Sequence, residues 1–540
     1  MNMRKFYLLA LIAWCVASGK AQSFQSDTIG FKMDRDSSVI MGECIEFPCW
    51  IQSVDADSTG TFLLVQGRDL NKKETGVKNT GDIWMILLPE KKVLWQRPIN
   101  YFVQQARLTD QGVSFVSKDK YFLLDLRTGK EIWAGKKMIP YSMNAEDNLL
   151  LAYKGSTMNG ISKQLQGYDM LTGDLLWKRE ISHRYGWNES LMLDDSTRLI
   201  VSDGLHTVRL SDGTGNDFPM KTGVDDYRSA AAIGALGIVA GVLTGTGFFP
   251  YGNNVVVELV SNVLTDDSLL YVASKEQLLC LDRQLNMKWG CPIPEDAGSC
   301  SRIFIKGDRL YMINYGYGYR DNLRNHSYSY AQSKLRVKIG RPFMASFDKK
   351  SGKNLCFHFL SDEKDMVEDS WFDTNNEYAI LSFADRISRI PFSADSVEEH
   401  RWDTETNGKI IRLLKRPFVL KDTDGSGFRE YNLTVDDPAF FLYTDKNAIF
   451  ETDQSLHVRR SFPLDKFGFF ERLGNGYSIV DYKGMALLLD SKGMEKARLR
   501  ISSDRFVIGD KVYAFSLDRK TIVDLSDVKV DEECIDERTM

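Results

Sequence analysis

The sequence has few of the residue patterns on which enzymatic chemistry usually depends. It contains no G-x-S-x-G nucleophile motif and no P-loop, so its pattern does not predict a hydrolase of that type or a nucleotide-binding enzyme. No two histidines stand at the H-x-x-x-H spacing of a zinc protease. The six histidines are scattered: His183, His206, His326, His358, His400 and His457. Catalytic residues are therefore not predicted, although a site assembled from distant segments stays open.

Cysteine is also sparse, and its spacing excludes the common cysteine sites. Besides Cys15, seven cysteines follow: Cys44, Cys49, Cys280, Cys291, Cys300, Cys356 and Cys534. None forms a C-x-x-C pair, which argues against zinc or a thioredoxin-like site. Cys44 with Cys49 and Cys291 with Cys300 are close enough to close short loops, but an odd count implies no complete disulfide framework.

The sequence has no basic tract, and this excludes nucleic acid as the expected partner. The net charge is −5, and without Arg4, Lys5 and Lys20 it is −8. Those three residues belong to a predicted signal peptide, residues 1–21. It has a basic start, an apolar run from Phe6 to Val16 and a small-x-small site ending at Ala21. Trp14 before Cys15 disfavours a lipoprotein, so we expect an exported protein that is periplasmic, associated with the outer membrane or at the cell surface.

A nine-residue pattern is the strongest positive signal. Asp125–Trp133 and Asp169–Trp177 both read D-x-x-T-G-x-x-x-W, 44 residues apart, and each follows an apolar, strand-like run. The pattern predicts a β-hairpin in which Gly129 or Gly173 supplies a positive φ at the turn. The tryptophans Trp133 and Trp177 are predicted to pack one sheet on the next. A period of about 40 to 50 residues with several strands per unit is typical of a β-propeller.

Weaker copies extend the pattern along the chain. Asp348–Cys356 keeps the spacing around Gly352, Asp282–Trp289 is one residue shorter, and an earlier unit ends at Trp95. Other units rest on strand rhythm alone: 199–218, 378–402, 440–462, 477–501 and 511–525. We count nine or ten strand-rich units and expect an all-β chain with a single propeller of eight blades, or seven. The predicted boundaries are an extension at 22–57 that contributes a closing strand, the propeller at 58–530 and a tail at 531–540.

Thr-Gly-x-x-x-Trp after a strand that ends in Asp resembles the PQQ-like β-propeller repeat. That family includes quinoprotein alcohol dehydrogenases and the non-catalytic propeller subunit of the outer-membrane β-barrel assembly machine. The enzymes carry two adjacent cysteines beside the cofactor, and this sequence has none. Their cofactor-floor tryptophan and calcium ligands also match no particular positions here. The resemblance therefore implies the fold and a protein-binding role more than quinone chemistry.

The first break in the period spans residues 227–252. Ala230 to Phe249 is an almost unbroken apolar run with glycines at small-xxx-small spacing: Gly237, Gly241 and Gly245. Such a run suits a transmembrane helix or membrane contact. The alternative is a buried helix or hairpin packed on the propeller. We favour this alternative, because a single crossing would place the two halves of one propeller on opposite sides of a membrane.

The second break, residues 315–340, is rich in tyrosine, glycine and serine. Its tyrosines are Tyr315, Tyr317, Tyr319, Tyr328 and Tyr330. This composition gives rigid amphipathic contact area on an adaptable backbone, so the segment is a candidate site for a protein partner or a carbohydrate. The alternative is a surface hairpin whose tyrosines stack on one another.

The third break, residues 408–437, resembles a calcium loop over nine positions. Its candidate metal ligands are Asp422, Asp424, Ser426 and Glu430. Leu433 stands where an EF-hand has its bidentate glutamate, and Asp436 or Asp437 would have to replace it. The alternative is a solvated Asp/Gly turn, which we favour; no other cofactor is expected.

These observations favour a non-catalytic exported scaffold that binds protein partners at the cell envelope, by resemblance an outer-membrane complex. A PQQ-dependent or other enzyme with its site in the propeller channel is the first alternative. A carbohydrate-binding propeller is the second.

Overall fold

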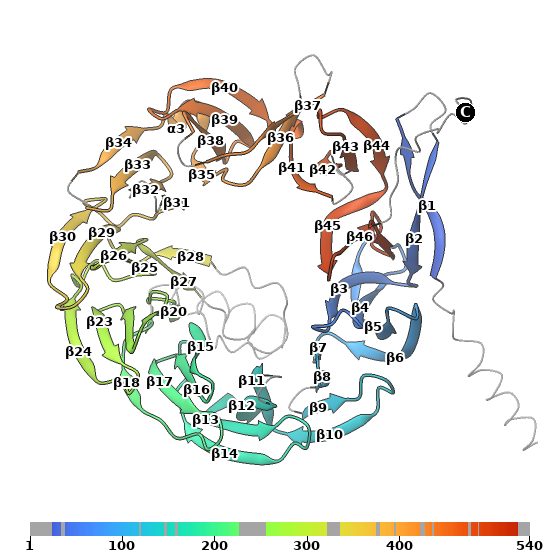
Figure 1. Ribbon diagram of the computed structural model, residues 1–540, viewed down its shortest axis with the longest axis horizontal. Coiled ribbons are helices and arrows are strands. Elements are labelled where there is room, and N and C mark those ends of the chain that lie inside the picture. Colours follow the sequence, from blue (N-terminus) through green and yellow to red (C-terminus); the bar gives the residue numbers. More distant parts are fainter. Residues whose placement is uncertain are drawn as a thin grey trace, which may run out of the picture.

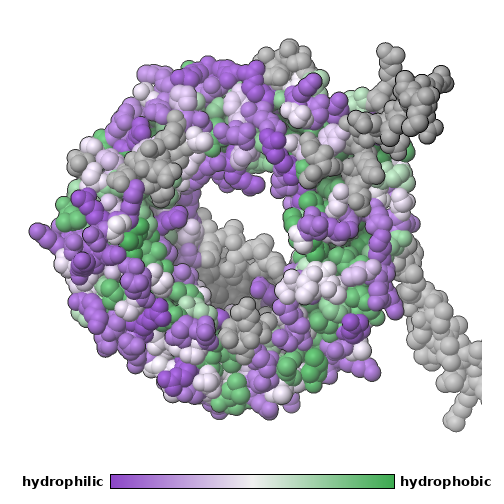
Figure 2. All heavy atoms as spheres, in the orientation of Figure 1, coloured by the Kyte–Doolittle hydropathy of each residue, from purple (hydrophilic) through white to green (hydrophobic). Residues whose placement is uncertain are grey.

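A computed structural model describes most of the 540 residues. The described ranges are 24–33, 38–117, 120–144, 148–156, 160–225, 255–320, 335–373, 378–393, 396–421, 427–434, 437–473, 477–483 and 485–526. Within these ranges the chain is almost entirely β-strand and forms ten antiparallel sheets. The sheets follow one another around a ring, and Figure 2 shows an opening at the centre of the ring. This arrangement is a β-propeller.

Eight of the sheets are separate four-stranded meanders. The first four comprise β3 (Trp50–Ala56), β4 (Phe62–Leu70), β5 (Val77–Leu87) and β6 (Lys92–Asn100); β7 (Gln104–Thr109), β8 (Gly112–Ser117), β9 (Lys120–Leu124) and β10 (Glu131–Lys136); β11 (Met138–Asn144), β12 (Leu149–Ser156), β13 (Gly160–Asp169) and β14 (Leu175–Glu180); and β15 (Glu189–Asp194), β16 (Thr197–Val201), β17 (Gly204–Arg209) and β18 (Asp217–Pro219). The other four comprise β21 (Leu264–Asp266), β22 (Leu269–Ala273), β23 (Gln277–Asp282) and β24 (Met287–Pro292); β25 (Ser301–Lys306), β26 (Arg309–Asn314), β29 (Phe343–Asp348) and β30 (Asn354–Phe359); β31 (Asp369–Asp373), β32 (Tyr378–Ser382), β33 (Arg386–Pro391) and β34 (Glu398–Arg401); and β35 (Ile410–Leu413), β38 (Ala439–Thr444), β39 (Ala448–Asp453) and β40 (Val458–Pro463).

An eleven-stranded sheet closes the ring, in the order β37-β36-β41-β42-β43-β44-β1-β2-β47-β46-β45. Its strands are β1 (Phe24–Lys32), β2 (Val39–Glu46), β36 (Phe418–Lys421), β37 (Phe428–Tyr431), β41 (Phe467–Arg472), β42 (Ser478–Tyr482), β43 (Met485–Leu489), β44 (Glu495–Leu499), β45 (Ile501–Ile508), β46 (Lys511–Ser516) and β47 (Thr521–Asp524). The short helices α3 (Thr404–Asn407) and η2 (Leu464–Lys466) lie in connections. Strands from the two ends of the chain therefore lie side by side, blue beside red in Figure 1.

This arrangement does not confirm the expected eight blades. Eight meanders stand apart as separate sheets, but β41–β44 and the set β45-β46-β47-β2 repeat the same four-strand order inside the closing sheet. The predicted extension at 22–57 contains β1 and β2, and β2 pairs with the C-terminal β47. It also contains β3, which already belongs to the first separate meander.

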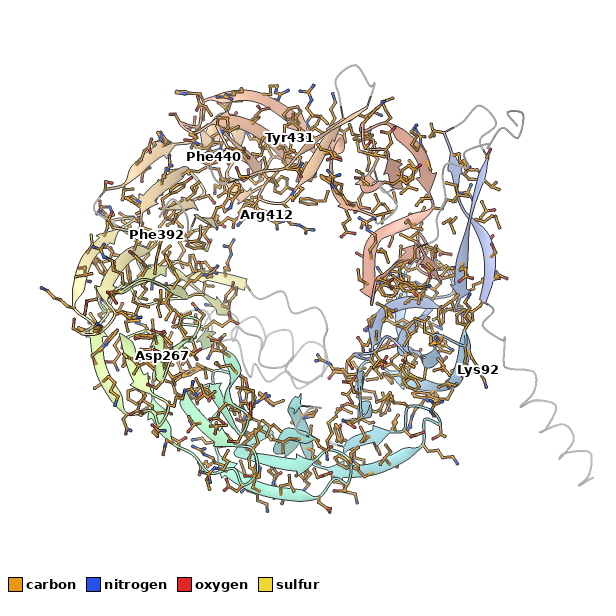
Figure 3. All side chains as sticks on the ribbon, in the orientation of Figure 1. Lys92, Asp267, Phe392, Arg412, Tyr431 and Phe440 are labelled. Carbon is orange, nitrogen blue, oxygen red and sulfur yellow. The ribbon has the colours of Figure 1, made fainter. Side chains whose placement is uncertain are left out.

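The core lies between neighbouring sheets. In β32 all five residues are buried, because a middle strand has a sheet on each side, whereas the outer strand β14 is mostly exposed. One cluster joins Trp84 of β5 to Tyr513 and Phe515 of β46. The first strand of a sheet lies at the inner rim and the last at the outer rim. Figure 3 shows this for Arg412 on β35 and Lys92 on β6.

The repeated tryptophans contact the glycine turns of the following sheet. Trp95 donates its indole N–H to the carbonyl oxygen of Leu126 at 2.8 Å, and Trp133 donates to Met170 O at 2.8 Å. The corresponding bonds of Trp177 and Trp289 reach Leu210 O at 2.7 Å and Lys349 O at 3.2 Å. A β-carbon on any of the four turn glycines would run into the tryptophan ring that lies over it. These glycines are Gly129, Gly173, Gly213 and Gly352, in that order. Each contact thus joins two consecutive copies of the motif.

A bulge recurs at one position of seven outer strands. In β10, Glu131 and Trp133 pair with Leu124 and Leu123, so Ile132 is the extra residue. The same two-against-one pairing precedes the equivalent position in β6, β14, β24, β30, β40 and β44. In β30, β40 and β44 that position holds Cys356, Arg460 and Ala497. The backbone repeat therefore continues where the tryptophan is lost.

Candidate partner-binding site

The strands on either side of the first break and the strands within the second form one extra sheet, which we call the accessory sheet. Its strands are β19 (Val224–Asp225), β20 (Val255–Val257), β27 (Tyr317–Arg320) and β28 (Leu335–Lys338), in the order β19-β20-β27-β28. The first segment leaves the sheet after Asp225 and re-enters at Val255, which pairs directly with Asp225. The second leaves after Arg320 and re-enters at its pairing partner Leu335. Residues 226–254 and 321–334 are distant from each other in the sequence, and each connects two paired strands of this one sheet.

The accessory sheet lies on the inner side of the ring, nearer the central opening than β24 and β30 (Figure 1). Backbone hydrogen bonds fix it to the adjoining meanders. Cys300 N–H donates to Tyr317 O at 2.8 Å, and Val367 N–H donates to Tyr315 O at 3.0 Å. These hydrogen bonds hold the sheet against the propeller.

The alternation Tyr315-Gly-Tyr-Gly-Tyr319 places three tyrosines on one face, because successive side chains of a strand point to opposite sides. The rings of Tyr315 and Tyr317 are stacked, with centroids 5.8 Å apart, and Tyr319 meets Tyr317 edge-on at 5.5 Å. Gly318 faces the other side, where a β-carbon would lie 2.6 Å from Leu259 and Val256. All three rings remain partly exposed. The tyrosines therefore do stack on one another, and the stack keeps an accessible surface.

Cationic side chains of β28 border this tyrosine face. The Arg336 guanidinium lies 5.2 Å from the centre of the Tyr317 ring, within the range of a cation–π contact. Its Nη2 atom is also 2.5 Å from Glu368 Oε2, and Lys338 forms an ion pair with Asp365 at 3.0 Å. These partners hold Arg336 in place, so the face presents ordered rather than freely moving groups.

Burial raises the pKa of the Tyr315 and Tyr317 phenols, and nearby Cys300 and Tyr319 add to the effect at Tyr317. Both phenols stay protonated at neutral pH and can act as hydrogen-bond donors. They are poor proton acceptors for general-base chemistry. The arrangement suits binding through aromatic surface and hydrogen bonds.

Several predicted site residues lie outside the described residues. These are Tyr328 and Tyr330, the apolar run 230–249, and the candidate calcium ligands Asp422, Asp424 and Ser426. Of the calcium set the structure describes Glu430, on β37, whose carboxylate forms an ion pair with Arg472 at 2.8 Å. Calcium binding stays a prediction. Among the described residues no group of three or more acidic, histidine or cysteine side chains is arranged to hold a metal ion.

No disulfide joins any two of the described cysteines Cys44, Cys49, Cys280, Cys291, Cys300 and Cys356, so neither short loop is closed by one. No helix within the described ranges is long and apolar enough to cross a membrane.

Sequence comparison finds no match, either to a known protein family or to a curated protein. Solved structures with a similar chain path include BamB from Moraxella catarrhalis, at 12% identity and a TM-score of 0.30 over 93% of this chain and 99% of that one. The dihydro-heme d1 dehydrogenase NirN in complex with DHE matches at 12% identity and a TM-score of 0.29, over 85% of this chain and 84% of that one. The WD40 β-propeller domain of Doa1 matches at 12% identity and a TM-score of 0.26, over 64% and 93%. The chain is a β-propeller, as its own sheets show.

Proposed function

We propose that this protein is a non-catalytic β-propeller scaffold that binds a protein partner at its accessory sheet. One observation carries the proposal: the connections 226–254 and 321–334, which lie at the first two breaks in the repeat, each join paired strands of a sheet that is not one of the repeated meanders. The ring does not need this sheet for its closure, which β1, β2 and β47 provide. Additions to a rigid scaffold commonly carry binding function.

The chemistry of the accessory sheet supports a protein as the partner. Tyrosine and arginine are enriched at protein–protein interfaces, where a planar ring contributes contact area at low cost in conformational entropy. Tyr319 and Arg336 stand opposite each other in the β27–β28 pairing. A partner segment that packs on these side chains would meet aromatic surface together with hydrogen-bond donors.

We further propose that the protein belongs to the PQQ-like propellers and acts in the cell envelope, beside an outer-membrane complex. The D-x-x-T-G-x-x-x-W repeat and the apolar stretch before Ala21 support this proposal. Cell fractionation of the tagged protein tests the location, and a protein that stays in the cytoplasm with residues 1–21 intact would contradict it.

The decisive experiment removes each inserted segment without disturbing its sheet. Because Arg320 pairs with Leu335, an Asn-Gly turn can replace residues 321–334, and the same turn can replace 226–254 between Asp225 and Val255. Tagged proteins are cross-linked in envelope fractions, and co-purified partners are identified by mass spectrometry. We expect a specific partner of the intact protein to be lost from one or both variants while their melting temperatures are unchanged.

The matched control shortens a different hairpin in the same way. Lys421 pairs with Phe428, so an Asn-Gly turn replaces residues 422–427 there. This control is expected to retain the partner. Retention by both accessory-sheet variants would overturn the proposal, and so would a Tyr319→Ser, Arg336→Ser double variant that binds the partner as the intact protein does.

A further inference from the structure

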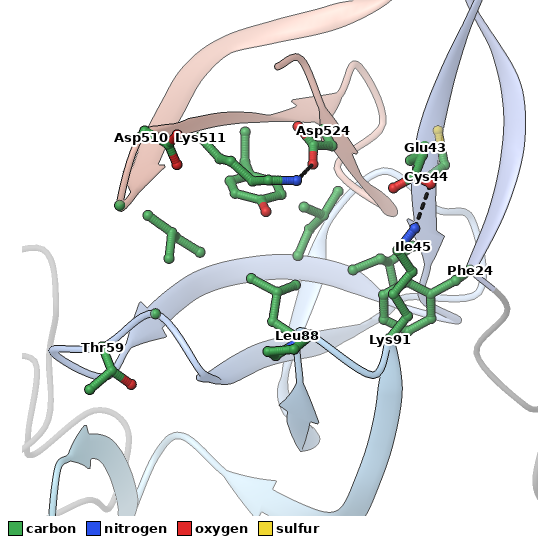
Figure 4. A pocket seen from close by; sticks show the side chains of 16 residues that line it. Phe24, Glu43, Cys44, Ile45, Thr59, Leu88, Lys91, Asp510, Lys511 and Asp524 are labelled. Atoms are coloured by element: carbon green, nitrogen blue, oxygen red, sulfur yellow. Dashed lines mark hydrogen bonds and ion pairs between the residues drawn. The ribbon is translucent and has the colours of Figure 1, made fainter. Parts of the chain in front are cut away.

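The place where the ring closes contains a cavity. β2 completes the last meander by pairing with β47, while β1 pairs with β44 of the preceding set of strands. Two turns of the first meander approach this junction, the β3–β4 turn at Thr59 and Gly60 and the β5–β6 turn at Leu88 to Lys91. They enclose a cavity of about 340 Å³ with strands from both ends of the chain (Figure 4). We call it the seam cavity.

The interior of the seam cavity is apolar. Leu88 projects from one side, and Ile45 and Ile522 lie on the paired strands β2 and β47. Ile508 and Tyr513 belong to β45 and β46. The volume lies in the range of pockets that take small molecules or single side chains of a partner. Transfer of an apolar group from water into such a cavity is favourable, at about 25 cal/mol per Å² of apolar surface buried.

The lining of the cavity carries more negative than positive side chains. Lys91 forms an ion pair with Glu43 at 2.5 Å, and Lys511 forms one with Asp524 at 3.2 Å. Both lysines are thus neutralised within the cavity. The fifth charged side chain is Asp510, which is exposed and makes no hydrogen bond or ion pair with any residue in the described ranges. A negative charge next to an apolar hollow is complementary to a ligand that joins an apolar group to a cation.

We propose that the seam cavity binds a peptide segment of a partner in which an apolar side chain stands next to a lysine or arginine. The apolar side chain fills the space between Ile45, Leu88 and Ile508, and the basic side chain pairs with Asp510. The occupant bridges the N-terminal strands to the C-terminal strands, so it stabilises the closed ring. This site is separate from the accessory sheet, and the two proposals can fail independently.

Thermal unfolding with short peptides measures occupancy of the cavity, because a ligand that binds only the folded protein raises its melting temperature. Acetyl-Leu-Phe-Lys-amide is compared with acetyl-Leu-Phe-Glu-amide at millimolar concentration and low ionic strength. The two peptides differ only in the sign of the charge next to the apolar side chain.

We expect the lysine peptide to raise the melting temperature and the glutamate peptide to leave it unchanged. Asp510→Asn should abolish this difference without lowering the melting temperature of the free protein. Glu90→Gln is the matched control, because Glu90 is an exposed carboxylate of the β5–β6 turn that does not line the cavity, and it should keep the difference. Loss of the difference in Glu90→Gln as well, or its persistence in Asp510→Asn, would overturn the pairing with Asp510.

Two results on the intact protein would also count against the proposal. An equal rise in melting temperature with the two peptides would remove the role of Asp510. A lysine peptide that does not raise the melting temperature would remove the binding site itself.

Discussion

The indole ring of Trp95 lies directly over Gly129 of the following sheet. A β-carbon on Gly129 would be 2.7 Å from Cδ2 of Trp95, and the indole N–H of Trp95 donates to Leu126 O at 2.8 Å. Gly129 also has a φ of +65°, a conformation that residues with a side chain rarely adopt. Glycine is therefore required at position 129 for two reasons: the turn needs a positive φ, and the Trp95 ring leaves no room for a β-carbon.

A comparison of two alanine variants separates these requirements. In Gly129→Ala the free energy of unfolding should fall by about 1 to 2 kcal/mol because of the positive φ. It should fall by a further ~1 to 3 kcal/mol because the new β-carbon overlaps the Trp95 ring. Gly307 has a φ of +57° and no atom within 4 Å of a β-carbon, so Gly307→Ala should lose the first amount alone. Urea unfolding measures both. Equal losses would show that the contact with Trp95 carries no stability.

Substitution of Trp177 tests the ring and its hydrogen bond separately. Trp177 is 6% exposed, and its indole N–H donates to Leu210 O at 2.7 Å. Trp177→Ala should cost about 3 to 5 kcal/mol in the free energy of unfolding. Trp177→Phe should lose about 1 kcal/mol for the hydrogen bond, together with part of the packing. Leu176→Ala is the control, because this neighbouring side chain is 50% exposed and should change stability by less than about 0.5 kcal/mol.

A disulfide across the closing strands tests how the ring is joined. Cys44 of β2 pairs with Val523 of β47, and both side chains are buried. Val523→Cys should form a disulfide with Cys44, because opposed residues of an antiparallel pair lie within its reach. The cross-link joins the two ends of the propeller and should stabilise it by up to about 5 kcal/mol. Thiol titration and melting temperature with and without reductant measure this, and Cys44→Ser with Val523→Cys should show no gain.

Acid should weaken the turns that carry the repeated aspartates. Asp169 accepts backbone N–H groups from Thr172 at 2.8 Å and Leu171 at 2.9 Å, and these bonds lower its pKa. Hydrogen bonds from the hydroxyl and N–H of Ser351 lower the pKa of Asp348 in the same way. Unfolded aspartates have a pKa of about 3.9 and bind protons first as the pH falls. This part of the stability is complete above about pH 5 and is lost as the pH drops through the folded-state pKa values.

Urea midpoints at several pH values between 7 and 3 measure this effect. Asp169→Asn should lower stability at pH 7 and make its decline toward pH 3 shallower, because one linked proton is removed. Asp510→Asn serves as the control, since it removes an exposed carboxylate with no hydrogen bond among the described residues. A decline that is identical in the two variants would contradict the role of the turn hydrogen bonds.

The nine-residue motif was visible in the sequence only where part of its Asp, Gly and Trp pattern survives. Arg460 and Ala497 occupy the tryptophan position in β40 and β44, and the bulge before them identifies the position. The strand rhythm of 440–462 and 477–501 indicated these two units, but the sequence could not place the tryptophan position within them. The reason is that a bulge is a property of strand pairing and many side chains tolerate it. The same limit explains why counting strand-rich units did not fix the number of blades.

Two parts of the candidate site differ in how far the sequence could predict them. The alternation Tyr315-Gly-Tyr-Gly-Tyr319 by itself indicated a strand with tyrosines on one face. Nothing in the sequence indicated that Arg336 would lie beside Tyr317. Nor did it indicate that the strands ending at Asp225 and Arg320 would belong to one sheet. Nothing in the sequence indicated the seam cavity either, since its walls come from residues as distant as Leu88 and Ile508.

The amino-acid sequence by itself determined the local structure: Asp, Thr and Gly at fixed spacing make a turn whose hydrogen bonds and positive φ are satisfied within nine residues. It also determined where that local rule stops, near 227 and 315. Only the tertiary structure decided that four turn glycines lie under the tryptophan of the preceding sheet, and that the strands beside the first interruption pair with those of the second. It also decided that strands from the two ends of the chain line one cavity. The physical reason is that these contacts join segments that are far apart in the chain. Their proximity depends on closure of the ring, which no local spacing of residues determines.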